Sequence, residues 1–172
     1  LLTAMSEATR VEQSIEHTER TEFDLTALIR DMGLAYQQSF PGHRIETRAV
    51  DTPCFINGSP ELIAQLLDKL MDNAIDFSAP GTAVTLALTA EGHSCRITVS
   101  NHGPVLPAQL DGRLFESLVS ARTGTTEKPH LGLGLFIVRL ITHFHHGQAS
   151  ARNLPDDSGV MVCVELPTAR AT

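Results

Sequence analysis

The fold of this chain is indicated by one short stretch of sequence, His130-Leu131-Gly132-Leu133-Gly134-Leu135-Phe136-Ile137-Val138-Arg139. Two glycines stand in a predicted turn, and an apolar helix is predicted to follow over residues 133–146. Glycine lets the backbone come close to a ligand. A helix N-terminus presents unpaired N–H groups and partial positive charge to an anion. Because paired glycines also cap helices or mark close packing, the stretch alone leaves a phosphate site and a helix cap equally open.

The bulk properties describe an ordinary globular chain. Its 172 residues are enough for one domain with a core. The net charge of -7 argues against nonspecific binding to nucleic acid. The longest apolar runs are too short to cross a bilayer. The first residues, Leu1-Leu2-Thr3, show neither an initiator Met nor a signal-peptide pattern, and we interpret the chain as a fragment of a longer protein.

The cysteines and histidines do not indicate a metal centre. Three widely spaced cysteines, Cys54, Cys95 and Cys163, suggest buried free thiols rather than a zinc site or a disulfide framework. Three histidines gather at the end of a predicted helix, at positions 143, 145 and 146. Solvation at the helix end, where cations favour the helix dipole, is the preferred interpretation over a metal site.

The hydrophobic pattern predicts helices laid against a mostly antiparallel sheet, a two-layer α+β sandwich with the helices on one face. A first helix over residues 1–20 has a narrow apolar stripe that suits a partner helix better than a globular core. Asp24 is predicted to cap the second helix, and either Asn57 or Ser59 the third. The predicted helices are 1–20, 25–39, from that cap to about 77, 113–119 and 133–146. The predicted strands are 44–50 and 53–56 around a turn, 82–90 and 94–100 as a hairpin, and 148–153 and 160–166 as another.

The third predicted helix carries the first chemistry-bearing segment. Lys69, Asn73 and Asp76 recur at helical spacing on a face away from the apolar stripe. Asn is a poor helix former at mid-helix, and its side-chain oxygen is a suitable ligand for Mg²⁺ that bridges phosphates. The alternative interpretation is a solvated polar face.

The second segment is the loop predicted over residues 101–107, at the end of a strand. An amide at this place, Asn101, can both donate and accept hydrogen bonds and so recognise a base; the alternative is an ordinary loop. Between this loop and the glycine turn lies a polar stretch that suits a lid and contains Arg122 and Lys128.

In this order the three segments resemble the ATP-binding domain of sensor histidine kinases, part of the gyrase, Hsp90, histidine kinase and MutL group with the Bergerat-type fold. The likeness covers residues 22–167. It rests on four boxes, the asparagine box at 72–75, the first glycine box at 101–107, the phenylalanine box at 113–116 and the second glycine box at 132–135. Residues 1–20 resemble the end of the second dimerisation-domain helix, which implies an ATP-binding domain over 21–172.

The resemblance implies ATP and Mg²⁺ as cofactors. Asn73 would coordinate Mg²⁺, Asn101 would face the adenine amino group, and Gly103 would allow close approach of the base. Phe115 would anchor the lid, and the glycine box would offer N–H groups to the phosphates. The nucleotide site so implied comprises Asn73, Asp76, Phe77, Asn101, Gly103, Val105, Leu106, Phe115, His130, Leu131, Gly132, Leu133, Gly134 and Leu135.

The resemblance also implies partners. The γ-phosphoryl would pass to a His on the upstream dimerisation domain and then to an Asp of a response regulator. The parent would be a homodimer anchored in the bacterial inner membrane, with this domain in the cytoplasm. No histidine of the chain fits the phosphoacceptor signature, so we expect the acceptor to lie upstream of Leu1 and the fragment not to phosphorylate itself.

Several positions depart from the family pattern. Lys69 stands where these kinases have Asn and related ATPases a general-base Glu, which predicts little ATP hydrolysis. It is predicted to contact phosphate or to pair with Asp72 or Asp76. Asp76 replaces a cation, which should weaken ATP binding unless Mg²⁺ or the lid cations compensate. Asn101 replaces an Asp, and Val105 a glycine.

These departures keep two alternatives open. One is a catalytically degenerate pseudo-kinase that serves as a binding module. The other is a serine kinase of the same fold that acts as an anti-sigma factor. The resemblance of residues 1–20 to a dimerisation-domain helix argues against this alternative.

Overall fold

The computed structural model describes residues 2–110, Phe115 and residues 130–169. Its helices are α1 (Leu2–His17), α2 (Leu25–Ser39), α3 (Pro60–Phe77) and α5 (His130–Phe144). Its strands are β1 (Thr21–Asp24), β2 (Arg44–Ala49), β3 (Phe55–Gly58), β4 (Ala83–Glu91), β5 (Ser94–His102), β6 (Gln148–Asn153) and β7 (Gly159–Pro167).

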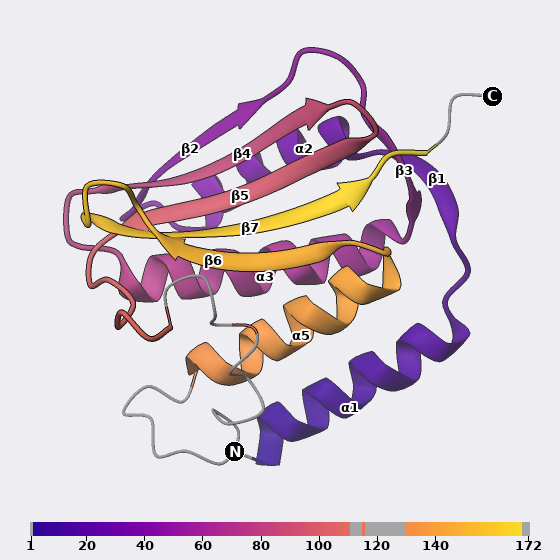
Figure 1. Cartoon of the computed structure of the whole chain (residues 1–172), viewed down its shortest axis with the longest axis horizontal. Coiled ribbons are helices and arrows are strands. Elements are labelled where there is room, and N and C mark those ends of the chain that lie inside the picture. The colour runs from indigo at the N-terminus through magenta and orange to yellow at the C-terminus, as the bar shows by residue number, and fades with distance from the viewer. Residues whose placement is uncertain (1, 111–114, 116–129, 170–172) are drawn as a thin grey trace.

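The main sheet has five strands in the order β2-β4-β5-β7-β6. Only the β2–β4 pair is parallel among these described strands, and the other pairs are antiparallel. Helices α2, α3 and α5 cover one face of the sheet, and α1 lies along the side of α5 that faces away from it (Figure 1). The predicted α+β sandwich is confirmed.

Local capping explains where the two central helices begin. The carboxylate of Asp24 accepts the backbone N–H of Thr26 at 3.0 Å and that of Cys54 at 3.2 Å. The hydroxyl of Ser59 accepts the N–H of Leu62 at 3.2 Å, ahead of a proline at the first helical position. Such caps contribute about 1 kcal/mol each. Both predicted caps are confirmed, with Ser59 rather than Asn57 as the cap of α3.

Several elements differ from the predicted ones. Strands β2 and β3 follow one another around a turn, as predicted. Strand β2 pairs in parallel with β4, and β3 pairs with β1, a strand that was not predicted. Strand β5 continues through His102, so Asn101 lies in a strand and not in a loop. Helix α5 begins at His130, three residues earlier than predicted, so Gly132 lies in its first turn rather than ahead of the helix, and Gly134 lies in the second turn. The helix predicted over 113–119 lies outside the described residues except for Phe115.

The apolar stripe of α1 is buried within the chain itself. Ala8 and Val11 belong to the hydrophobic core, and Ile15 packs against it. The partner helix that the narrow stripe predicts is α5 of the same chain. This helix therefore forms a third layer outside the sandwich.

The histidine cluster does not behave as one group. His143 and His146 are exposed, whereas only 2% of His145 is accessible. The N–H of Ser59 donates to Nε2 of His145 at 3.0 Å, and Nδ1 lies 2.7 Å from the carbonyl of Ile141. Because a carbonyl only accepts, Nδ1 carries the proton and the ring is neutral. The interpretation as a solvated helix end is therefore wrong for His145. Its ring packs against Gly58, just before the start of α3. A Cβ at Gly58 would overlap the imidazole, so the glycine makes room for the ring.

The described residues contain no group of three or more His, Cys, Asp or Glu side chains suited to a metal ion. All three cysteines are free, with Cys54 and Cys95 buried and Cys163 half-buried. The expectation of buried free thiols is confirmed for Cys54 and Cys95, whereas Cys163 is only half-buried.

The buried histidine makes stability depend on pH. Burial lowers the pKa of His145 below its ordinary value of 6.5, so the unfolded chain binds this proton more readily than the folded one. Its contribution is fully present above about pH 6.5 and is lost as the pH falls toward the lowered folded-state pKa, with a slope of at most about 1.4 kcal/mol per pH unit. Urea denaturation at pH values on both sides of 6.5 should show this loss.

A matched pair of variants separates the contribution of His145 to this pH dependence from that of the overall charge of the chain. His145→Gln keeps a hydrogen-bond acceptor for Ser59 and should flatten the pH dependence, whereas His143→Gln at an exposed position should retain it. The same slope in both variants would contradict the assignment to His145.

Candidate functional site

The site is centred on Asn73 of α3. Apolar side chains that include Leu66, Leu70 and Ala74 hold α3 in the core, and Asn73 is drawn in with them to 9% exposure. Its Nδ2 is buried and has no hydrogen-bond partner among the described residues. An unsatisfied buried amide costs about 1–3 kcal/mol. Asn73 therefore does not lie on a solvated face, and its amide is available to an acceptor that enters from outside.

Gly134 of α5 faces this amide. A Cβ built at Gly134 would lie 3.6 Å from Nδ2 and 3.7 Å from Oδ1 of Asn73, and 3.9 Å from Cδ of Lys69. The contact between α3 and α5 thus brings together three residues that the sequence predicts for the site. The glycine leaves open the space that a side chain would fill beside the amide.

The N-terminus of α5 supplies the second half of the site. N–H groups in the first turn of a helix lack carbonyl partners within it. Because α5 begins at His130, these groups belong to the turn that contains Gly132, and those of Gly134 and Leu135 come after it. The backbone N–H groups that could bind an anion therefore lie nearer Gly132 than the prediction of residues 132–135 implies. Leu135 is buried in the core.

Asn101 lies on the helix-facing side of the sheet. It continues the alternation of buried residues along β5 and is itself buried. Its Nδ2 makes one long hydrogen bond of 3.4 Å to the carbonyl of His102. The interpretation as an ordinary loop residue is wrong, because the strand reaches beyond it.

The turn after β5 packs against the end of α3. The N–H of Ala79 donates to the carbonyl of His102 at 2.7 Å, and that of Gly103 to the carbonyl of Ser158 at 2.9 Å. Gly103 has a φ of 151°, and a Cβ there would collide with the carbonyl oxygen of Phe77. This contact gives a structural reason for the glycine, whereas its role toward a base stays a prediction.

The neighbouring site residues differ in accessibility. Leu106 and Phe115 are buried in the core, Phe77 is half-buried, Asp76 is exposed, and Val105 is 42% exposed. Nη1 of Arg139 on α5 donates to the carbonyl of Phe115 at 3.3 Å, which ties this residue to the core. The side chains of residues 130–133 lie outside the described part.

Asn153 was missed by the sequence analysis. Its Oδ1 accepts the N–H of Leu106 at 2.7 Å, and its Nδ2 donates to the carbonyl of the same residue at 3.1 Å. The end of β6 thereby holds the loop after β5 in place. An Asn before a predicted turn carries no local signal of a contact 47 residues away.

Lys69 has a partner that the sequence did not suggest. Its Nζ lies 2.6 Å from a carboxylate oxygen of Glu7 on α1. No ion pair to Asp72 or Asp76 is present among the described residues, so both of those predicted pairings are wrong. Partial burial raises the pKa of Asp72, and the charges of Asp68, Asp76 and Glu7 raise it further, although Lys69 lowers it.

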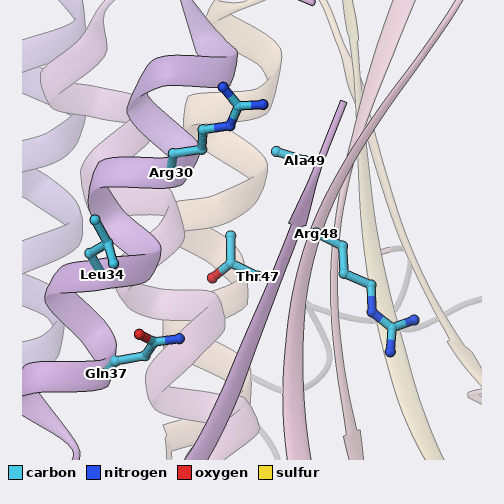
Figure 2. Close-up of a pocket in the computed structure, with 6 residues that line it drawn as sticks. All are labelled: Arg30, Leu34, Gln37, Thr47, Arg48 and Ala49. Carbon is cyan, nitrogen blue, oxygen red and sulfur yellow. The ribbon is translucent and has the colours of Figure 1, made fainter. Parts of the chain in front are cut away.

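Two grooves lie away from this site. One of about 480 Å³ separates α2 from the edge strand β2, where Thr47 and Ala49 point toward α2 and Arg48 points away (Figure 2). There the Arg30 and Gln37 side chains donate to the carbonyls of Val50 and Ile45, which protects the sheet edge. The other, of about 520 Å³, lies over β5, β6 and β7 on the helix-free face and is lined by Arg96, Arg152 and Cys163 among others. Within the described residues, no helix has the length and apolarity that spanning a bilayer requires.

Comparisons with known proteins agree with this arrangement. The family model described as histidine kinase-, DNA gyrase B-, and HSP90-like ATPase matches residues 58–170, more than half of the chain. Sensor protein VanSC of Enterococcus gallinarum is 31% identical over 87% of this chain and 38% of its own length. Sensor protein CreC of Escherichia coli is 27% identical over 85% of this chain and 30% of its own length. The chain thus spans about a third of these relatives.

Solved structures agree in fold. The catalytic domain of the histidine kinase ThkA in a nucleotide-free form is 26% identical and has a TM-score of 0.73, with 87% of this chain and 96% of that chain covered. Full-length ShkA in complex with AMPPNP is 21% identical and has a TM-score of 0.76, with 98% of this chain and 35% of that chain covered. In two-component kinases the matched domain is the ATP-binding catalytic domain. The chain belongs to the family of histidine kinase-, DNA gyrase B- and HSP90-like ATPases.

Proposed function

We propose that this chain is the ATP-binding catalytic domain of a two-component sensor histidine kinase. The observation that carries the proposal is the buried amide of Asn73, which lacks a partner in the described structure and faces Gly134 of α5. In a family of ATPases, an unpaired polar group beside a helix N-terminus is suited to the polyphosphate of ATP.

The residues present fit a nucleotide with Mg²⁺. The first turn of α5 would bind phosphate oxygens through backbone N–H groups. Oδ1 of Asn73 would coordinate Mg²⁺, and its Nδ2 would donate a hydrogen bond to the nucleotide. Bound Mg²⁺ supplies neutralisation of phosphate charge. The chain itself contributes positioning and electrostatic stabilisation, which are the main contributions of a protein to phosphoryl transfer.

Base recognition would fall to Asn101 at the end of β5. Its amide oxygen accepts from the adenine amino group, but without the charge of the usual Asp, and so more weakly. Val105 is exposed enough to contact the base. These two residues would set the affinity for the base, while α3 and α5 hold the phosphates.

The wider reaction needs parts beyond this domain. The γ-phosphoryl would pass to a His on an upstream dimerisation domain and then to a response regulator, in a homodimeric parent anchored in the membrane. Residues 1–20 would be the end of a dimerisation helix. The structure of ThkA with the response regulator protein TrrA is an example of such a partner for a protein of this fold.

A degenerate kinase that binds without catalysis is the second candidate. The observation that favours it is electrostatic, since Asp76 replaces a cation and Glu7 neutralises the positive charge of Lys69. Nucleotide binding followed by phosphotransfer to the complete dimerisation domain separates the two. Binding without transfer would favour the degenerate kinase.

Asn73→Ala should abolish Mg²⁺-dependent nucleotide binding without loss of stability. The substitution removes an unsatisfied buried amide, so the free energy of unfolding should stay constant or rise by about 1 kcal/mol. Isothermal titration with an ATP analogue, with and without Mg²⁺, measures the first effect and urea denaturation the second. Gln65→Ala removes an amide at an exposed position of α3 outside the candidate site, so it is the matched control and should retain binding. Unchanged affinity in Asn73→Ala would remove the basis for a site on this helix.

Gly134→Ala should stabilise the fold and weaken nucleotide binding. Alanine in a helix is about 0.5–1 kcal/mol more favourable than glycine, and the new methyl group would meet the Asn73 amide at ordinary contact distance. Thermal unfolding and titration with an ATP analogue check the two effects. If the variant is more stable but binds the nucleotide equally well, the space beside Gly134 is not needed for nucleotide binding.

Asn101→Ala should weaken ATP binding about fivefold, by loss of one hydrogen bond of about 1 kcal/mol. Binding of GTP should change less, because the guanine edge carries a carbonyl at the corresponding place. Competition titrations with both nucleotides provide the measurement. Equal loss for both would mean that Asn101 is a structural residue only.

A further inference from the structure

Helix α1 is attached to α5 at several points. Ala8 and Val11 are buried at the contact between the two helices. Beyond the helix, the guanidinium of Arg20 stacks over the ring of Phe144 at 4.0 Å from its centroid and donates to the carbonyl of the same residue. The N-terminal segment is thus held on the same helix whose first turn forms half of the candidate site (Figure 1).

The attached helix reaches the other half of the site through one ion pair. Glu7 of α1 lies 2.6 Å from Nζ of Lys69, whose side chain is 24% exposed. Lys69 precedes Asn73 by one helical turn, and both face the gap at Gly134. A positive charge beside the unpaired amide is therefore held by a carboxylate from the N-terminal helix.

The surroundings of the pair are acidic. Asp68, Asp72 and Asp76 follow one another at four-residue spacing on α3, and Asp68 already accepts the hydroxyl of Tyr36 at 2.6 Å. A triphosphate near this face meets repulsion from the carboxylates, and Glu7 adds to it. Lys69 can offset that repulsion only when its ammonium is released from Glu7.

We propose that α1 restrains nucleotide binding through the Glu7–Lys69 ion pair, in which Glu7 competes with the nucleotide phosphates for the ammonium group of Lys69. Attachment of α1 and binding of nucleotide then oppose each other by the same factor in both directions. The inference rests on the proposed function and adds the regulation of that site. It makes Lys69 a phosphate-contacting residue whose availability depends on the position of the N-terminal helix.

The test is the affinity for Mg²⁺–AMPPNP in four variants. Glu7→Gln keeps the shape of the side chain and removes its charge, so it should bind about threefold to fivefold tighter than the original chain, as expected for a partly exposed pair. Glu12→Gln makes the same charge change at an exposed position of α1 and should bind as the original chain does. Lys69→Gln should bind nucleotide more weakly than the original chain. Adding Glu7→Gln to that variant should restore little affinity, because the ammonium group for which Glu7 competes is already absent.

A second measurement follows α1 directly. In the original chain, Mg²⁺–AMPPNP should speed hydrogen exchange at the amides of α1, and the Glu7→Gln variant should show faster exchange there without nucleotide. Thermal unfolding of each variant checks that the sandwich remains folded.

The outcomes separate the two proposals. If the original chain binds nucleotide and Glu7→Gln binds equally well, the restraint is refuted and the proposed function stands. A similar gain in nucleotide affinity in Glu12→Gln would mean that the effect comes from the overall charge of the chain, and it would also refute the restraint by α1. If neither the original chain nor Glu7→Gln binds nucleotide, the proposed function fails and this inference fails with it.

Discussion

The contact between α3 and α5 is the interaction on which the rest of the structure depends. Both helices lie under the sheet, and α3 contributes fully buried side chains along most of its length, Leu62, Ile63, Leu66, Leu67, Leu70 and Met71. Burial of such side chains contributes about 1.5–3 kcal/mol each. This packing is strong enough to hold Asn73 in the interior with an unsatisfied amide, and it leaves that amide facing a glycine.

Electrostatics adds a second constraint at the candidate site. The face of α3 beside the site is acidic, and its Lys69 is paired with a residue from outside the sandwich. The candidate site and the N-terminal helix therefore share the positive charge of Lys69. Because α1 also packs on α5, it contacts both helices of the candidate site, α5 through its buried face and α3 through Glu7.

Local signals predicted much of the fold. The caps at Asp24 and Ser59 are short-range hydrogen bonds that the residue types themselves indicate, and the structure confirms them. The hairpins of β4 with β5 and of β6 with β7 follow from alternation around turn residues. The partners of β2 and β3 were not predicted, because β2 pairs with β4, which is distant in the sequence, and β3 pairs with β1, which was not recognised as a strand.

The site divides in the same way. The sequence by itself determined which residue types stand at the asparagine and glycine boxes, and periodicity placed Lys69 and Asn73 on one helix face, because these depend only on chemistry and local geometry. The tertiary structure alone decided that Asn73 is buried without a partner, that Gly134 faces it, and that Glu7 binds Lys69. These are contacts between segments far apart in the chain, and they arise only when α1, α3 and α5 pack together, which no local pattern specifies.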